Sequence, residues 1–252
     1  MLGITKQHAA VIMIIVFFPL LLALPAVAYV AGEVRKMKDN FCPEGNYWQN
    51  YFNIKSGDSS VVLVDTSNAI PGEDGEAAFE DVEQWVRNFP PFEQISIRGL
   101  PETPNEKSPF DSDSLCVTWS KGTAPDLIAG GLIVERNFRH KFLPKVRKAF
   151  DEAIDLPEAD ESPILETLSA FKKEGVRSVF LVSDMMQNVR TGKGAESHYE
   201  PILLCEEQCA DVKGLNLNVY YIKRAEVRYP PNHKDIWARH FNSQEIEWHS
   251  GE

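Results

Sequence analysis

Buried apolar runs and amphipathic segments alternate along the chain after residue 60. Residues 61–64 form a continuous apolar run, typical of a strand that is covered on both faces. In residues 76–89 the apolar positions recur at helical spacing instead. The same patterns predict further strands at 94–100, 114–119, 176–182, 215–222 and 245–248, and further helices at 132–154 with a break at Pro144, 163–173, 199–213 and 234–241. This alternation predicts an α/β fold with a mostly parallel sheet and helices on both faces.

An uncharged apolar segment precedes this region at residues 9–32. As a helix it would span roughly 36 Å, enough to cross the hydrocarbon core of a bilayer. The alternative is a cleaved signal peptide, because Lys6 precedes the segment and Ala-Val-Ala at 26–28 fits a cleavage site. The predicted organisation is an N-terminal tail at 1–8, a transmembrane helix or signal anchor at 9–32, a linker at 33–59 and one domain at 60–252.

Charge and cysteine content limit the partners and the compartment. The net charge of −11 argues against nucleic-acid binding, which needs basic patches that neutralise phosphates. Four cysteines without a CxxC pair suit disulfides in an oxidising compartment. Arg35, Lys36 and Lys38 follow the membrane segment, however, and the positive-inside bias would keep them cytoplasmic. Both orientations of the domain stay open on these two signals.

Oxygen-bearing side chains follow two of the predicted strands and open one predicted helix. Asp65 and Ser67 follow the first strand, Ser162 precedes a helix, and Asp184 follows the strand at 176–182. Because the carboxyl ends of parallel strands meet at one edge of a sheet, these side chains can converge there. Carboxylates and hydroxyls together suit a hard cation such as Mg²⁺ or Mn²⁺. The alternatives are turn or capping roles, most clearly for Ser162, which stands before Pro163.

Two of these stretches resemble a known family. VVLVDTSNA at 61–69 resembles the opening of a von Willebrand factor A domain, whose metal-ion-dependent adhesion site begins Asp-x-Ser-x-Ser, and SVFLVSDMMQ at 178–187 resembles the strand that supplies a late aspartate. The resemblance implies a three-layer, Rossmann-like domain that binds Mg²⁺ or Mn²⁺. The implied ligands are Asp65, Ser67, Ser162 and Asp184. The second serine of the motif falls on Ala69, which cannot ligate through its side chain, so the implied site is incomplete.

The order of several short motifs narrows the resemblance. An N-terminal apolar segment followed by CPEG, VVLVDTS, SPILETL, LVSDMMQ and VYYIKR is similar to a group of membrane-anchored bacterial proteins with this type of domain. That similarity implies a single-pass protein of the bacterial inner membrane with a periplasmic domain, the cytoplasmic face remaining open. It also implies a disulfide between Cys42 and Cys116, for which the alternative is two unpaired buried thiols.

The expected function is protein binding or scaffolding, without catalysis and without a small-molecule substrate. The signatures GxSxG and HExxH are absent from the sequence. The residues expected at a partner-binding rim are Asn68, Met185, Met186, Gln187 and Asn188, although packing within a loop is equally compatible with the two methionines. Two alternatives remain: a metal-free structural component of a membrane assembly, and a Mg²⁺-dependent phosphohydrolase with Asp65 as nucleophile.

Overall fold

Six strands form one sheet at the centre of the molecule, in the order β3-β2-β1-β4-β5-β6. The computed structural model describes residues 40–42, 59–103, 106–118, 131–186, 212–224, 229, 231–241 and 246–250. The strands are β1 (Ser59–Val64), β2 (Gln94–Gly99), β3 (Leu115–Cys116), β4 (Val176–Ser183), β5 (Asn216–Tyr221) and β6 (Ile246–Ser250). Neighbouring strands pair in parallel except for the short β3, which runs antiparallel to β2. The predicted α/β class and mostly parallel sheet are therefore confirmed.

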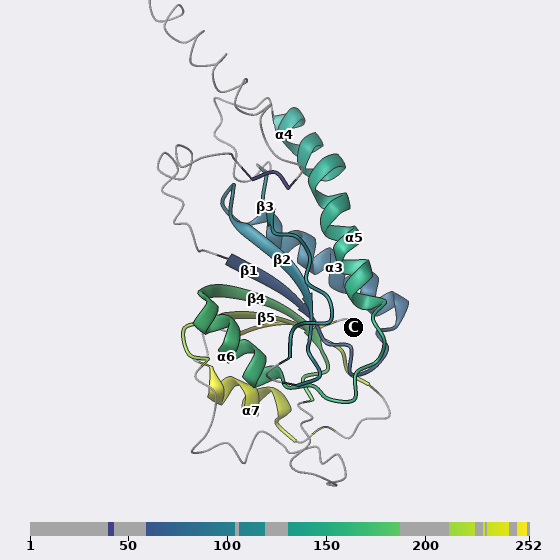
Figure 1. Cartoon of the computed structure of the whole chain (residues 1–252), viewed down its shortest axis with the longest axis vertical. Helices are drawn as coiled ribbons and strands as arrows, with labels where there is room; N and C mark the ends of the chain where they lie inside the picture. Colours follow the sequence, from purple (N-terminus) through teal and green to yellow (C-terminus); the bar gives the residue numbers. More distant parts are fainter. Residues whose placement is uncertain are drawn as a thin grey trace, which may run out of the picture.

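Helices cover both faces of the sheet, as Figure 1 shows. One face carries α3 (Gly72–Arg87), α4 (Gly131–Asn137) and α5 (Leu143–Ile154), and the other carries α6 (Ile164–Glu174) and α7 (His233–His240). β1 lies between the two layers. Its side chains at Val62 and Val64 pack into the core on the first face, while Val61 and Leu63 pack into the core on the second. A strand buried on both faces is apolar at every position, which explains the continuous run in the sequence.

Two predicted elements differ from the structure. The expected strand at 114–119 shortens to the two residues of β3. The expected break at Pro144 does not occur, because a π-helical segment, η1 (Phe138–Phe142), connects α4 to α5. Pro144 lies in the first turn of α5, directly after this wider turn, where the helical hydrogen-bond pattern shifts. The missing amide of a proline is tolerated at such a position.

Several predictions concern parts of the chain that the structure leaves undescribed. They are the tail at 1–8, the membrane segment at 9–32, most of the linker at 33–59, the helix at 199–213 up to residue 211, and the rim residues Gln187 and Asn188. In the described ranges, no helix combines the length and the apolar character that a membrane span requires.

The disulfide between Cys42 and Cys116 is confirmed, with the two Cα atoms 4.8 Å apart. Next to it, the amide of Cys116 donates a hydrogen bond to the carbonyl oxygen of Asn40 at 2.9 Å. The ring of Phe41 packs edge-on against Phe142 at 5.8 Å, and the Lys145 ammonium lies 5.0 Å from the Phe41 ring centre. The segment that precedes the domain is thus fastened both to the edge of the sheet and to the helical layer.

Replacing both cysteines with serine should lower the free energy of unfolding by about 4 kcal/mol, because the cross-link closes a loop with a sequence separation of 74 residues. Urea denaturation of the full chain in detergent measures the loss. Reductant should move the wild-type midpoint to that of the variant and leave the variant unchanged. Equal wild-type midpoints with and without reductant, with both thiols open to alkylation in the folded protein, would contradict the cross-link.

Candidate functional site

The candidate site lies where the order of strands in the sheet reverses. β1 and β4 are adjacent and parallel, with Val64 opposite Val182, so the residues that follow them leave the sheet side by side. The amide of Asp65 continues this pairing by donating to the carbonyl of Val182 at 3.0 Å. Asp184 follows β4 at the same edge. In open α/β sheets such a reversal is the usual position of a binding site.

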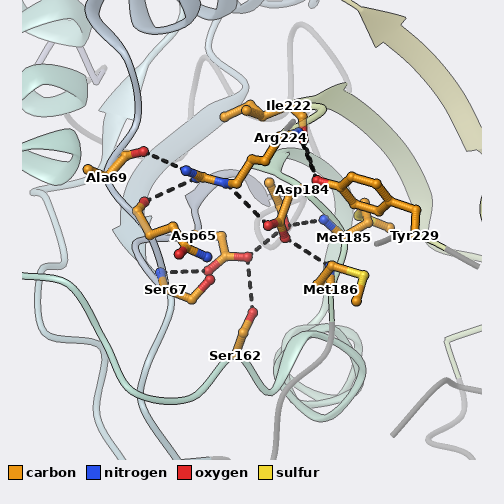
Figure 2. Close-up of polar contacts among 12 residues, drawn as sticks. Asp65, Ser67, Ala69, Ser162, Asp184, Met185, Met186, Ile222, Arg224 and Tyr229 are labelled. Atoms are coloured by element: carbon orange, nitrogen blue, oxygen red, sulfur yellow. Dashed lines mark hydrogen bonds and ion pairs between the residues drawn. The ribbon is translucent and has the colours of Figure 1, made fainter. Parts of the chain in front are cut away.

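Asp65 is a buried carboxylate held by three hydrogen bonds from its own chain (Figure 2). Its Oδ2 atom accepts from the hydroxyls of Ser162, at 3.0 Å, and Ser183, at 2.6 Å. Its Oδ1 atom accepts from the amide of Ser67 at 3.0 Å. A carboxylate removed from water needs such donors to remain stable in its ionised form. Asp65 therefore joins the ends of β1 and β4 to the loop before α6.

The serines differ in what they contribute. Ser67 was expected to ligate through its hydroxyl, but it bonds to Asp65 through its backbone amide. Ser162 does not cap α6: Pro163 occupies the N-cap position without a side-chain capping bond, and the Ser162 hydroxyl points at Asp65 instead. Ser183 stands next to Asp184 at the end of β4, and its hydroxyl also points at Asp65. Its hydroxyl accepts from the amide of Met185 at 2.7 Å while donating to Asp65.

Asp184 is the second buried carboxylate, with its side chain 2% exposed. Its Oδ1 atom accepts from the amide of Met186 at 2.9 Å. Its Oδ2 atom lies 3.2 Å from Nε of Arg224, an ion pair in which the N–H is not aligned for a hydrogen bond. Burial, followed by repulsion from Asp65, raises the pKa of the Asp184 carboxyl to about 6, although the Met186 amide and Arg224 both lower it. At neutral pH the carboxyl is therefore mostly ionised.

Arg224 lies in the segment after β5 and brings a positive charge to the rim, the edge of the sheet where Asp65 follows β1 and Asp184 follows β4. One terminal nitrogen, Nη1, donates to the carbonyl of Ala69 at 2.8 Å, and Nη2 donates to the carbonyl of Asn68 at 3.3 Å. The Arg224 amide donates to the Tyr229 hydroxyl at 2.9 Å, which fixes the start of the side chain. Figure 2 shows the guanidinium lying between the 68–69 backbone and Asp184. The role of Arg224 was not predicted from the sequence, although a basic residue after a strand that ends at the same edge is a usable signal.

The donor chemistry of the rim suits a hard cation, but its arrangement does not fit one. The Asp65 carboxylate already accepts three hydrogen bonds, and Asp184 faces the guanidinium of Arg224. At position 69, where the motif would place a serine hydroxyl, alanine offers only its backbone carbonyl as a ligand. This carbonyl accepts a hydrogen bond from Arg224. Within the described residues, no group of three or more Asp, Glu, His or Cys side chains is placed to hold a metal ion.

The expected partner-binding residues separate into exposed and buried members. Asn68 and Met186 are partly exposed at the rim. Met185 is fully buried, with a positive φ of 59°, and packs in the core beneath α7. Its carbonyl accepts from the Trp237 indole at 3.0 Å and lies 3.1 Å from Nε2 of His233. Expecting Met185 at the partner-binding surface was therefore wrong, and the alternative of loop packing is correct.

Comparison with known proteins adds no family assignment. No protein-family model matches the chain, and no curated protein matches its sequence.

The three serines give a matched test of how the rim is held together. Ser162→Ala and Ser183→Ala should each lower the free energy of unfolding by about 1.5–3 kcal/mol, because each removes a hydrogen bond to a buried charge. Ser67→Ala should change it by less than about 0.5 kcal/mol, since the amide that bonds to Asp65 remains. Urea denaturation at neutral pH measures all three. A loss at Ser67 as large as the other two would show that its hydroxyl also holds the rim.

Proposed function

We propose that the chain is a membrane-anchored protein-binding or scaffold module of the von Willebrand factor A type, acting without catalysis. The motif resemblance at 61–69 and 178–187 supports this, together with a parallel sheet that carries both motif aspartates at its point of reversal. The exposed part of the rim is a loop and a helix start, with residues 69 and 71–73 open to solvent. That loop is the surface we assign to the partner.

The observation that carries the proposal is the internal bonding of Asp65. A carboxylate that attacks phosphorus needs an accessible oxygen with a free lone pair in line with the substrate. The Asp65 side chain is buried, and both oxygens accept hydrogen bonds from the chain itself. Such a carboxylate is suited to holding loops in place, which favours binding over phosphoryl transfer.

A loop that is already fixed is suited to binding because less conformational entropy is lost when a partner docks. Arg224 bonds to the backbone at Asn68 and Ala69, and the amide of Ser67 bonds to Asp65. The backbone of three successive loop residues, 67–69, is therefore fixed by hydrogen bonds to Asp65 and Arg224. This arrangement also supports the metal-free form of the function, in which the partner contacts the loop directly.

The disulfide supports the location in this proposal. Stable disulfides persist in oxidising compartments, which for a bacterial membrane protein means the periplasmic side. Residues 33–41 separate the expected membrane segment from Cys42, and an extended stretch of that length reaches at most about 30 Å. Because Cys42 is bonded to β3, the domain would stay close to the membrane surface. The partner is then expected at or within the same membrane.

Site-specific photo-crosslinking tests the proposal. A photoreactive residue at exposed Ala69 in the full chain, produced in its native membrane, should give one discrete adduct that excess unmodified protein suppresses. Lys173 is the matched control, because it is exposed at the end of α6 that leads into the start of β4, opposite the rim.

Equal labelling from both positions, or no adduct from Ala69, would contradict a partner-binding rim. Turnover of p-nitrophenyl phosphate that Asp65→Asn abolishes would instead establish the phosphohydrolase.

A further inference from the structure

Arg224 joins three separate parts of the rim: its guanidinium contacts two of them, and its backbone belongs to the third. The guanidinium bonds to the carbonyls of Asn68 and Ala69 after β1 and pairs with Asp184 after β4, while its own backbone follows β5. Its side chain is only 12% exposed. A positive charge placed among carbonyl and carboxylate oxygens from several loops is what a divalent cation provides at an oxygen-lined site.

We propose that Arg224 is the resident cation of this rim, and that the chain keeps the rim assembled without a divalent metal because the guanidinium occupies that role. A divalent ion bound to Oδ2 of Asp184 would lie against the guanidinium, whose Nε is 3.2 Å from that oxygen. Two positive charges at such a separation repel strongly in a buried site. Arg224 and a metal ion are therefore mutually exclusive partners of Asp184.

Ala69 and Arg224 act together in this proposal. The methyl side chain of Ala69 offers no oxygen to a metal ion, while its backbone carbonyl accepts from Nη1 of Arg224. Arginine suits this exchange better than lysine, because its planar group can donate to two carbonyls while facing a carboxylate. The proposal goes beyond partner binding, since it holds whether or not a protein docks on the rim.

Removing the positive charge should uncover a cation site. Electron paramagnetic resonance of Mn²⁺, which separates free from bound ion, is measured with the full chain in detergent. Wild type should leave Mn²⁺ free, whereas Arg224→Ala and the longer neutral variant Arg224→Gln should bind it with affinity raised about tenfold or more. Mg²⁺ should displace it. Arg224→Lys, which keeps the charge, should behave as wild type toward the ion.

A second substitution identifies the oxygen that is uncovered. Asp184→Asn in the Arg224→Ala background should abolish the gained binding, whereas Asp113→Asn, at an exposed position before β3, should leave it intact. If the neutral variants lose their fold without metal, added Mn²⁺ should restore it, as circular dichroism would record.

Wild-type binding of Mn²⁺ that Asp184→Asn removes would overturn the proposal. Folded neutral variants that leave Mn²⁺ free would also overturn it, and so would unfolded variants that Mn²⁺ does not restore.

Discussion

Two carboxylates buried at the ends of adjacent strands must be compensated, and the arrangement of the rim follows from that requirement. Asp65 and Asp184 leave β1 and β4 side by side, and burial together with repulsion from Asp65 raises the pKa of Asp184. Asp65 is stabilised by hydrogen-bond donors from the loop after β1, the loop before α6 and the end of β4. Asp184 receives one amide and the charge of Arg224. The two carboxylates are thus stabilised differently: Asp65 by neutral hydrogen-bond donors, and Asp184 by a backbone amide together with a cation.

Ser183 and Met185 link the rim to the core beneath it. Ser183 bonds both to Asp65 and to the amide of Met185, whose side chain is buried under α7. The carbonyl of Met185 in turn accepts from Trp237 of α7. A change in the hydrogen bonding of Asp65 would therefore alter the packing of α7. The rim and the helical layer below it form one connected structure.

The sequence predicted the elements that local patterns specify. β1 and β4 are apolar at consecutive positions because both faces are covered, so their ends and the two aspartates could be located. The continuity through Pro144 was missed, because a π-helical turn is not visible in residue spacing. The two-residue β3 was overestimated, because alternation in the sequence does not reveal how many residues find a partner strand.

The details of the site were less predictable because they depend on side-chain direction. Ser67 and Ser162 carry the same hydroxyl, yet only Ser162 turns it toward Asp65. Arg224 lies 155 residues after Ala69, and its contact with that loop exists only because the sheet places β5 beside β4. Spacing rules describe neighbours within one element and cannot supply such a pairing. The missed residues are those whose role is created by the tertiary fold.

The most direct test of the central claim is a double-mutant cycle between Asp184 and Arg224, with unfolding of the full chain measured in the presence of a chelator. The four proteins are wild type, Asp184→Asn, Arg224→Gln and the double variant. If Arg224 compensates Asp184 without metal, the coupling free energy should be about 2 kcal/mol in favour of the pair. A coupling free energy within about 0.5 kcal/mol of zero would contradict this.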